Sequence, residues 1–367
     1  MPCRIYLRSD QSVLHRQQFS SNRVTIFAPG WVKEGLKTLG QHLNGVKFDV
    51  YESQRGSKNV PEESFTITED FNEQSLTILQ KIARNEEHNV TGVINLSLYE
   101  DIKDRKILYS IRDLVRQCIV VGDDTYSKCG GYNCAIESQK KSRVYICDLA
   151  ALQFQQPYNT GRLVLVQKNE PHKGILDEFI YENVVGEQRQ TFEEVLDKWE
   201  HGDVATRKRY LRHDGFGLAT GNNMSCFIDT QAYCSFVKMD VILSGTAITK
   251  MVTTHHPKDK INFKFLKYGT GFFAGRFAYE LDRLILFGVL DGLEQLFMKT
   301  DVQNVIKCVE LPFYKCDPKN AKRIEVLTSK YGIQVVFGNN DALKKSTILN
   351  LIVATTNCGD NHAVCGE

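Results

Sequence analysis

The chain is organised around one stretch, Ile261-Asn-Phe-Lys-Phe-Leu-Lys-Tyr-Gly-Thr-Gly-Phe-Phe-Ala-Gly275, which runs into an amphipathic segment at 277–297. The alternating apolar residues Ile261, Phe263 and Phe265 predict a strand, and the closely spaced glycines predict a turn into a helix. A strand, a glycine-containing loop and a helix often bind phosphate, because glycines let backbone N–H groups approach an anion. A tight strand-to-helix connection whose aromatic residues belong to the core explains the stretch equally well.

The composition is that of an ordinary globular protein. With 367 residues, 42% of them apolar and 25% charged, the chain is long enough for two α/β lobes or one elaborated lobe. The net charge of +2 argues against a dedicated binder of nucleic acid or of membrane surfaces, which needs a basic excess. No apolar run reaches the length of about eighteen residues that a membrane-spanning helix needs.

Eleven cysteines are many for a chain whose first residues lack an apolar signal segment. Their spacing forms no repeated Cys-x-x-Cys pair, and we therefore expect reduced thiols in a cytoplasmic protein. Cys358, His362 and Cys365 have a spacing that could hold a metal ion, but the sequence supplies no evident fourth ligand. Packing thiols and a loop histidine are the better interpretation, so we predict no metal site.

Strands and helices alternate along the first part of the chain. Strands are predicted at 23–27, 46–51, 92–96, 118–124 and 142–148, and helices at 31–43, 76–83 and 107–115. This alternation predicts a mostly parallel sheet covered by helices. A polar loop is expected at 60–71, a strand at 163–166 and a charged helical connector at 192–211.

The second part of the chain continues with further strands and helices. Strands are predicted at 225–229, 235–243, 261–266, 305–311, 333–337 and 348–353, and helices at 277–297 and 318–331. We predict an N-terminal α/β lobe with its connector at 1–210 and a second lobe at 211–367. One continuous unit is the alternative.

Polar loops follow several predicted strands, and ligands of α/β sheets usually bind at the carboxyl ends of strands. Asp123 and Asp124 end one strand, and the loop after it contains Tyr132 and Asn133. A polar tail at 354–362 follows the last strand. A plain turn is the more ordinary interpretation of each of these loops. The motifs of serine hydrolases, P-loop NTPases and zincins do not occur.

Four segments carry a resemblance to a known family. They are Lys128-Cys-Gly-Gly-Tyr-Asn133, Tyr268-Gly-Thr-Gly-Phe-Phe-Ala-Gly275, Leu311-Pro-Phe-Tyr-Lys-Cys-Asp-Pro318 and Val353-Ala-Thr-Thr-Asn-Cys-Gly-Asp-Asn-His-Ala363. They are similar to the MavL-like family of divergent macrodomain ADP-ribosylhydrolases, which is known from bacterial effectors and has eukaryotic relatives. The resemblance implies an α/β fold with a macrodomain-like mixed sheet flanked by helices, elaborated by an N-terminal α/β lobe, in which 211–367 binds ADP-ribose.

The resemblance also implies an activity. The characterised effector hydrolyses ADP-ribose from a modified arginine of ubiquitin, so we expect an enzyme that removes mono-ADP-ribose from a protein, with arginine as the linkage. The expected partner is an ADP-ribosylated protein in the cytoplasm of a eukaryotic or host cell. ADP-ribose is then ligand or product, no cofactor is required, and neither nucleic acid nor membrane takes part. A reader that binds ADP-ribose without cleaving it, or a protein-interaction scaffold, is the alternative.

Two of these segments correspond to known macrodomain segments. Ile352-Val-Ala-Thr-Thr-Asn357 is similar to the segment Ile-Val-Asn-Ala-Ala-Asn, which contacts the ribose next to the scissile bond, and Gly269-Thr-Gly-Phe-Phe273 is similar to the loop that wraps the diphosphate. Here they occur in reversed chain order, and Ala354 replaces the first Asn. The ligand-binding residues expected from the resemblance and the polar loops are Gly269, Thr270, Gly271, Phe272, Phe273, Gly359, His362, Tyr132 and Asn133.

Asp360 and Asn357 are the predicted catalytic residues. The Asn357 amide can both donate and accept hydrogen bonds, which suits ribose hydroxyls. Asp360 is our first candidate for the carboxylate that activates water or steadies the oxocarbenium-like charge at C1″. Four other acids are alternatives: Asp214, Asp229, Asp282 and Asp291. The last two are expected within the helix after the glycine loop, facing solvent.

Overall fold

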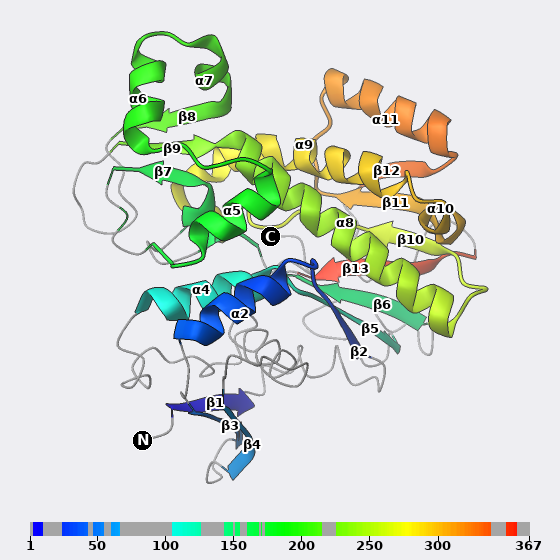
Figure 1. The fold of residues 1–367 in the computed structure, drawn as a ribbon. Coiled ribbons are helices and arrows are strands. Elements are labelled where there is room, and N and C mark those ends of the chain that lie inside the picture. The colour runs from blue at the N-terminus through cyan, green and yellow to red at the C-terminus, as the bar shows by residue number, and fades with distance from the viewer. Residues whose placement is uncertain are drawn as a thin grey trace.

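A mixed seven-stranded sheet forms the centre of the protein. The computed structural model describes residues 3–9, 24–42, 47–54, 60–66, 105–125, 143–149, 151–154, 160–168, 170, 173–214, 225–338 and 350–357. The strands of the sheet lie in the order β12 (Gln334–Gly338), β11 (Ile306–Pro312), β10 (Ile261–Lys264), β13 (Ile352–Asn357), β6 (Arg143–Asp148), β5 (Ile119–Thr125) and β2 (Val24–Phe27) (Figure 1). The chain is therefore an α/β protein.

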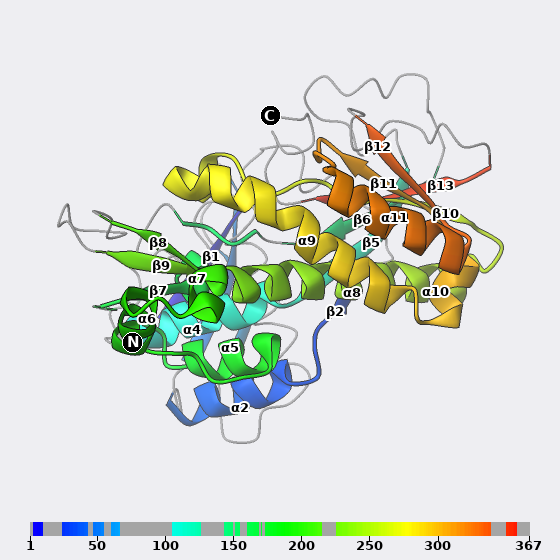
Figure 2. The same ribbon diagram turned by 90° about the horizontal axis from the view of Figure 1, so that it is seen from above.

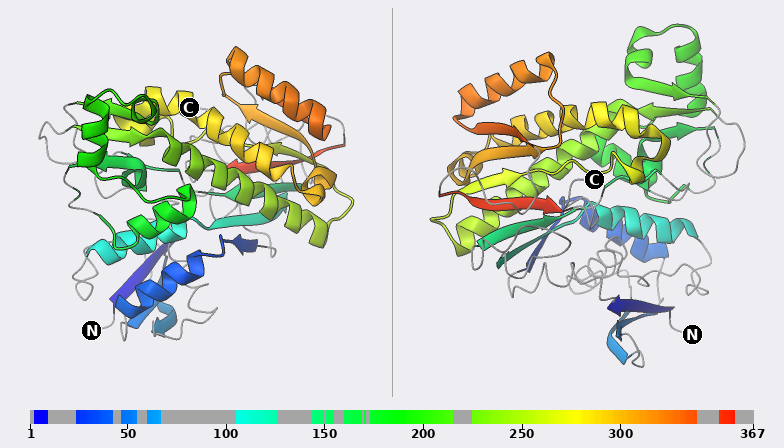
Figure 3. Two further views of the ribbon diagram at one scale, coloured as in Figure 1. Left: turned by 45° about the horizontal axis from the view of Figure 1, so that its top comes forward. Right: turned by 180° about the vertical axis from the view of Figure 1, so that it is seen from behind.

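The sheet is parallel over most of its width. The pairs β12–β11, β11–β10, β10–β13 and β13–β6 are parallel, whereas β5 runs antiparallel to both of its neighbours, β6 and β2. The last strand, β13, lies between β10 and β6, as the view from behind shows (Figure 3). The sheet thus joins strands from both sides of residue 210, where the sequence suggested a boundary between two lobes.

Two smaller sheets accompany the central one. The first pairs β1 (Cys3–Ser9), β3 (Lys47–Gln54) and β4 (Val60–Thr66), and Figures 1 and 3 show it below the rest of the molecule. The second pairs β7 (Leu165–Gln167), β9 (Cys226–Asp229) and β8 (Tyr210–His213) in antiparallel fashion. Its edge strand, β8, runs towards the glycine loop at 269–275, so this sheet also takes part in the candidate site.

Two long helices, α8 (Thr230–His255) and α9 (Ala278–Leu296), pack along each other on one side of the central sheet (Figure 2). Helix α8 also packs against β5 and β6. The other helices are α2 (Val32–His42), α4 (Arg105–Arg116), α5 (Asp177–Val185), α6 (Phe192–Glu200), α7 (Val204–Arg209), α10 (Thr300–Val305) and α11 (Pro318–Tyr331), with the 3-10 turns η3 (Thr160–Val164) and η4 (Phe272–Phe277). None of the helices in the described ranges is both long enough and apolar enough to cross a membrane.

The alternating residues that predicted β10 do form one side of the main core. Ile261, Phe263 and Phe265 are fully buried in the same cluster as Val241 of α8 and Leu281 of α9. Because side chains alternate between the two sides of a strand, the residues between them face the other side of the sheet.

Glycines on α9 allow α8 to approach closely. A Cβ atom added at Gly288 would lie 2.7 Å from the carbonyl oxygen of Cys234 and 2.8 Å from Cβ of Val237. One added at Gly292 would lie 2.6 Å from Cβ of Val241. Such distances leave no room for a larger side chain, so the close packing of the two helices requires glycine at these positions.

Most predicted elements are confirmed to within a few residues, but three predictions are wrong. The strand expected at 235–243 lies inside α8, where Val237, Val241 and their neighbours are buried at helical spacing against α9. The loop expected at 60–71 contains strand β4. The single helix expected at 192–211 is divided into α6 and α7 by Gly202, whose φ of 81° does not belong in a helix.

Other differences are shifts of an element along the chain. The strand expected at 348–353 is β13, which begins at Ile352 and continues to Asn357. The strand expected at 163–166 is β7 preceded by the turn η3. The helix expected at 76–83 and the strand expected at 92–96 lie outside the described residues.

We expect Gly288→Val to lower the free energy of unfolding by about 1–3 kcal/mol, because the new side chain overpacks the α8–α9 contact. Gly30→Val is the matched control, since nothing lies within 4 Å of a Cβ atom there. Urea denaturation of both variants measures the difference. Equal stability of the two variants would contradict the close helix contact.

Candidate functional site

The glycine loop and the start of the polar tail leave the same edge of the central sheet. Strand β10 pairs in parallel with β13, with Lys264 opposite Thr355. Beyond β10, the backbone N–H of Leu266 donates to Oγ1 of Thr356 at 2.9 Å. The final residue of β13, Asn357, lies opposite Asp148 at the end of β6. The carboxyl ends of β10, β13 and β6 therefore meet, which is the edge where α/β proteins usually bind ligands.

The loop after β10 uses glycine where its backbone requires it. Gly269 has a φ of 66° and Gly275 a φ of 56°, both in the region that side chains rarely adopt. A Cβ atom at Gly269 would also lie 3.0 Å from Cβ of Ala151, in the segment that follows β6. Gly271 between them is exposed. The backbone of this loop is therefore fixed by packing on one side and open on the other.

A buried polar network holds the residue that begins the loop. Oη of Tyr268 donates to Oδ2 of Asp240 on α8 at 2.6 Å, and the same oxygen accepts from Nη2 of Arg116 on α4 at 3.1 Å. All three side chains are buried. Burial raises the pKa of Asp240 above its ordinary value, while Arg116 and Tyr268 act in the opposite direction. Burial and the nearby Asp240 raise the pKa of Tyr268 well above its ordinary range, so its hydroxyl remains a donor.

Aromatic rings close the far end of the loop. Phe277, the last residue of η4, packs edge-on against Phe154 with ring centroids 5.6 Å apart and against His213 at 4.8 Å. His213 ends strand β8, and its Nε2 atom lies 3.8 Å from Oε1 of Glu280 in the first turn of α9. The loop thus lies between the central sheet and the end of the smaller sheet.

Charged groups surround the loop and also lie beneath it. Lys267 forms an ion pair with Asp282 of α9. Within the sheet, Nζ of Lys264 lies 3.5 Å from Oε2 of Glu310 on β11, and Nδ2 of Asn262 donates to that oxygen at 3.0 Å. Lys264 and Glu310 are both almost fully buried. Central strands of parallel sheets are usually apolar, so this buried ion pair near the carboxyl edge departs from the ordinary pattern.

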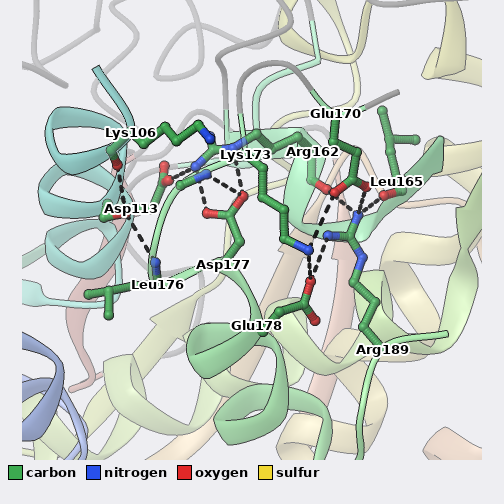
Figure 4. Close-up of polar contacts among 12 residues, drawn as sticks. Lys106, Asp113, Arg162, Leu165, Glu170, Lys173, Leu176, Asp177, Glu178 and Arg189 are labelled. Carbon is green, nitrogen blue, oxygen red and sulfur yellow. Dashed lines mark hydrogen bonds and ion pairs between the residues drawn. The ribbon is translucent and has the colours of Figure 1, made fainter. Parts of the chain in front are cut away.

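A second buried network ties η3 and α5 to α4 (Figure 4). The guanidinium of Arg162 pairs with two buried carboxylates, those of Asp113 on α4 and Asp177 on α5. Asp177 also accepts from the backbone N–H of Gly174 at 3.0 Å. Burial raises the pKa of Asp177, and Arg162 opposes that shift. We interpret this network as structural, because each of these contacts joins one element of the fold to another.

Arg189 extends this structural network towards β7. It donates to the carbonyl oxygen of Arg162 at 3.0 Å and to that of Leu165, and it pairs with Glu170 at 2.9 Å (Figure 4). An arginine that binds two carbonyl oxygens satisfies backbone groups that a strand edge would otherwise leave without partners. The network therefore fixes the segment that separates β6 from α5.

The structure places only some of the predicted ligand-binding residues. Gly269 and Thr270 are partly buried in the loop, Gly271 is exposed, and Phe272 and Phe273 lie in the turn η4. Asn357 ends β13 at the shared edge. Five predicted residues lie outside the described residues, namely Gly359, Asp360, His362, Tyr132 and Asn133. The candidate metal ligands Cys358 and Cys365 lie outside them too.

One expectation about the sheet edge is wrong. Asp123 and Asp124 were expected at the ligand edge because they end a buried strand. That strand, β5, runs antiparallel to β6, so Asp124 lies opposite Val144 at the amino end of β6. The two aspartates therefore lie towards the edge opposite Asn357.

The alternative acids already have partners in the fold. Asp229 is fully buried, caps α8 and accepts from Oη of Tyr181 at 2.6 Å. Asp214 is exposed and accepts from Oγ of Ser225 at 2.7 Å. Asp282 and Asp291 lie in α9, as expected, where each pairs with a basic residue. These contacts give Asp229 a structural role.

Sequence reasoning missed several side chains around the loop. The pairs Tyr268–Asp240 and His213–Glu280 are each formed by residues from distant parts of the chain. No linear motif contains either pair, so only tertiary structure reveals them. In the described part of the chain, no group of His, Cys, Asp and Glu side chains is arranged to hold a metal ion.

Comparison with known proteins adds no relative. The chain matches no model of a protein family, and a search of curated proteins finds no match either.

We expect Tyr268→Phe to lower the free energy of unfolding by about 1–3 kcal/mol, because the buried Asp240 carboxylate loses its hydroxyl donor. Tyr279→Phe is the matched control, since Tyr279 is 71% exposed. Urea denaturation distinguishes the two variants. If both were as stable as the wild type, the Tyr268 hydroxyl would not anchor the loop.

Proposed function

We propose that this protein binds ADP-ribose at the carboxyl edge of β10 and β13 and removes mono-ADP-ribose from a modified protein. In this proposal the linkage is to arginine, and ubiquitin is the substrate suggested by the MavL-like resemblance. The fold would be macrodomain-like, with its two ligand segments in reversed chain order. Water is the co-substrate, and no cofactor is needed.

The observation that supports this proposal most is the parallel pairing of β10 with β13. The two segments that resemble the diphosphate loop and the ribose-binding strand are far apart in the sequence. They nevertheless lie at the ends of neighbouring strands, at one edge of the sheet. The backbone N–H of Leu266 donates a hydrogen bond to the Thr356 side chain between them. A dinucleotide-like ligand needs its phosphates and its ribose held side by side, and two segments that begin at one edge of the sheet would suit that requirement.

The chemistry assigns a separate task to each segment. Backbone N–H groups of the exposed part of the loop around Gly271 would hold the diphosphate, and the fixed φ angles of Gly269 and Gly275 would keep them in place. Asn357 would contact the ribose next to the scissile bond. Asp360 remains the proposed carboxylate of the tail, activating water or stabilising positive charge at C1″.

A reader that binds ADP-ribose without cleaving it is the second candidate. One observation favours it: Ala354, buried in the middle of β13, stands where the standard macrodomain segment has an asparagine. Loss of that amide removes a polar group from the predicted ribose site. The two candidates differ in whether the bound nucleotide is released from its protein.

Arginine-linked mono-ADP-ribosylated ubiquitin separates the two candidates. We expect incubation with the protein to release free ADP-ribose, which chromatography detects. Asp360→Ala should abolish that release. Binding without release over several hours would favour the reader. Absence of heat in calorimetry with ADP-ribose would exclude both and leave a protein-interaction scaffold.

We expect Thr270→Glu to weaken ADP-ribose binding at least tenfold, about 1.4 kcal/mol, because a carboxylate in the loop repels the diphosphate. Thr328→Glu is the matched control, since Thr328 is exposed on helix α11 and lies outside the loop. Isothermal titration calorimetry measures both dissociation constants. Equal weakening in the two variants would indicate a general charge effect and argue against the loop as the diphosphate site.

A further inference from the structure

Glu280 and His213 form a pair of titratable side chains beside the glycine loop. Glu280 lies in the first turn of α9, directly after the loop, and His213 ends β8 of the smaller sheet. Their side chains are 26% and 23% exposed, and Nε2 of His213 lies 3.8 Å from Oε1 of Glu280. Both side chains are therefore partly shielded from water, and they lie beside Phe277, which ends the turn after the loop.

The position of this pair is fixed by packing. The imidazole of His213 stands edge-on to the ring of Phe277 at 4.8 Å, and Phe277 packs in turn on Phe154. Phe277 also precedes α9, so the same contact places His213 next to the helix start that carries Glu280. The imidazole cannot move away from the carboxylate without disturbing this aromatic stack.

Glu280 differs from Asp282 and Asp291 of α9 in the contacts that its carboxylate oxygens make. Asp282 pairs with Lys267, and Asp291 pairs with Arg323 at 2.7 Å. In Glu280, Oε1 faces His213, while Oε2 is shielded from solvent and has no hydrogen-bond partner among the described residues. A buried carboxylate oxygen without a donor is costly, so its presence indicates a group that a ligand or a water satisfies.

We propose that Glu280 is the acid–base residue of this site and that His213 positions its carboxylate. The inference rests on the proposed function, because it names the group that would act on the N-glycosidic bond of ADP-ribosyl-arginine. Sequence reasoning selected Asp360 to activate water or to stabilise positive charge at C1″; with Glu280 as the acid–base residue, Asp360 keeps the second of these tasks. A carboxylate can accept a proton from water and later return it to a leaving group.

The proton balance of the step is complete with water as the only co-reactant. The carboxylate of Glu280 accepts a proton from water as the water oxygen bonds to C1″ of the ribose. The bond between C1″ and the arginine nitrogen breaks, and its electron pair goes to that nitrogen. The protonated carboxyl group then gives its proton to the leaving guanidine. The products are ADP-ribose and unmodified arginine, and Glu280 returns to its carboxylate form.

Glu280→Gln tests this inference, because it keeps the size of the side chain and removes its basicity. With arginine-linked mono-ADP-ribosylated ubiquitin under single-turnover conditions, we expect the release rate to fall at least about 100-fold, the usual contribution of general acid–base catalysis. The dissociation constant for ADP-ribose should stay within about threefold of the wild type, a difference below 1 kcal/mol. Glu294→Gln is the matched control, since Glu294 lies on the same helix and pairs with Arg323.

His213 is tested separately as a positioning residue. His213→Phe keeps a ring against Phe277 but removes the nitrogen, and we expect kcat to fall while KM stays close to the wild-type value. His213→Gln restores a nitrogen donor and should recover part of the lost kcat. A merely structural role would instead give similar kcat values for the two variants.

The outcomes separate this inference from the proposed function. A wild-type protein that does not bind ADP-ribose overturns both. A wild-type protein that binds but releases nothing overturns the role of Glu280 and leaves the reader. Glu280 is not the acid–base residue if Glu280→Gln releases ADP-ribose at the wild-type rate. The same conclusion follows if the variant loses ADP-ribose affinity and release in parallel. In both cases an active wild type still supports the hydrolase.

Discussion

The parallel pairing of β10 with β13 is the interaction on which the rest of the structure depends. It inserts β13, the last of the described strands, between β10 and β6, so the two sides of the sheet are joined only when this segment is in place. The pairing continues beyond β10 through the Leu266–Thr356 hydrogen bond. Because non-local parallel pairs form only after long loops have closed, this contact makes the fold a property of the whole chain.

Two kinds of support hold the glycine loop at this edge. Below it, Tyr268 is tied to Asp240 and Arg116, which come from α8 and α4. Beside it, Phe277 packs on the side chains of Phe154 and His213. A loop fixed from two sides by buried groups keeps its backbone N–H groups in place, which suits recognition of a preformed anion such as a diphosphate.

Much of the architecture could be predicted from the sequence because it depends on local patterns. Alternating apolar residues predicted β10, and helical spacing predicted α9 and α11 close to their observed bounds. The pattern failed at 235–243, a stretch of a largely buried helix in which six of nine residues are apolar. Such a stretch does not distinguish a strand from a buried helix, and the close contact with Gly288 decides for the helix.

The sequence by itself determined the strand, the glycine loop and the helix that follows it, because these need only neighbouring residues and the permissive backbone of glycine. Tertiary structure alone decided that β13 lies beside β10, that β5 runs antiparallel, and that His213 meets Glu280. The physical reason is that strand order and side-chain encounters depend on how distant segments share one core, and no local pattern records which segments will meet.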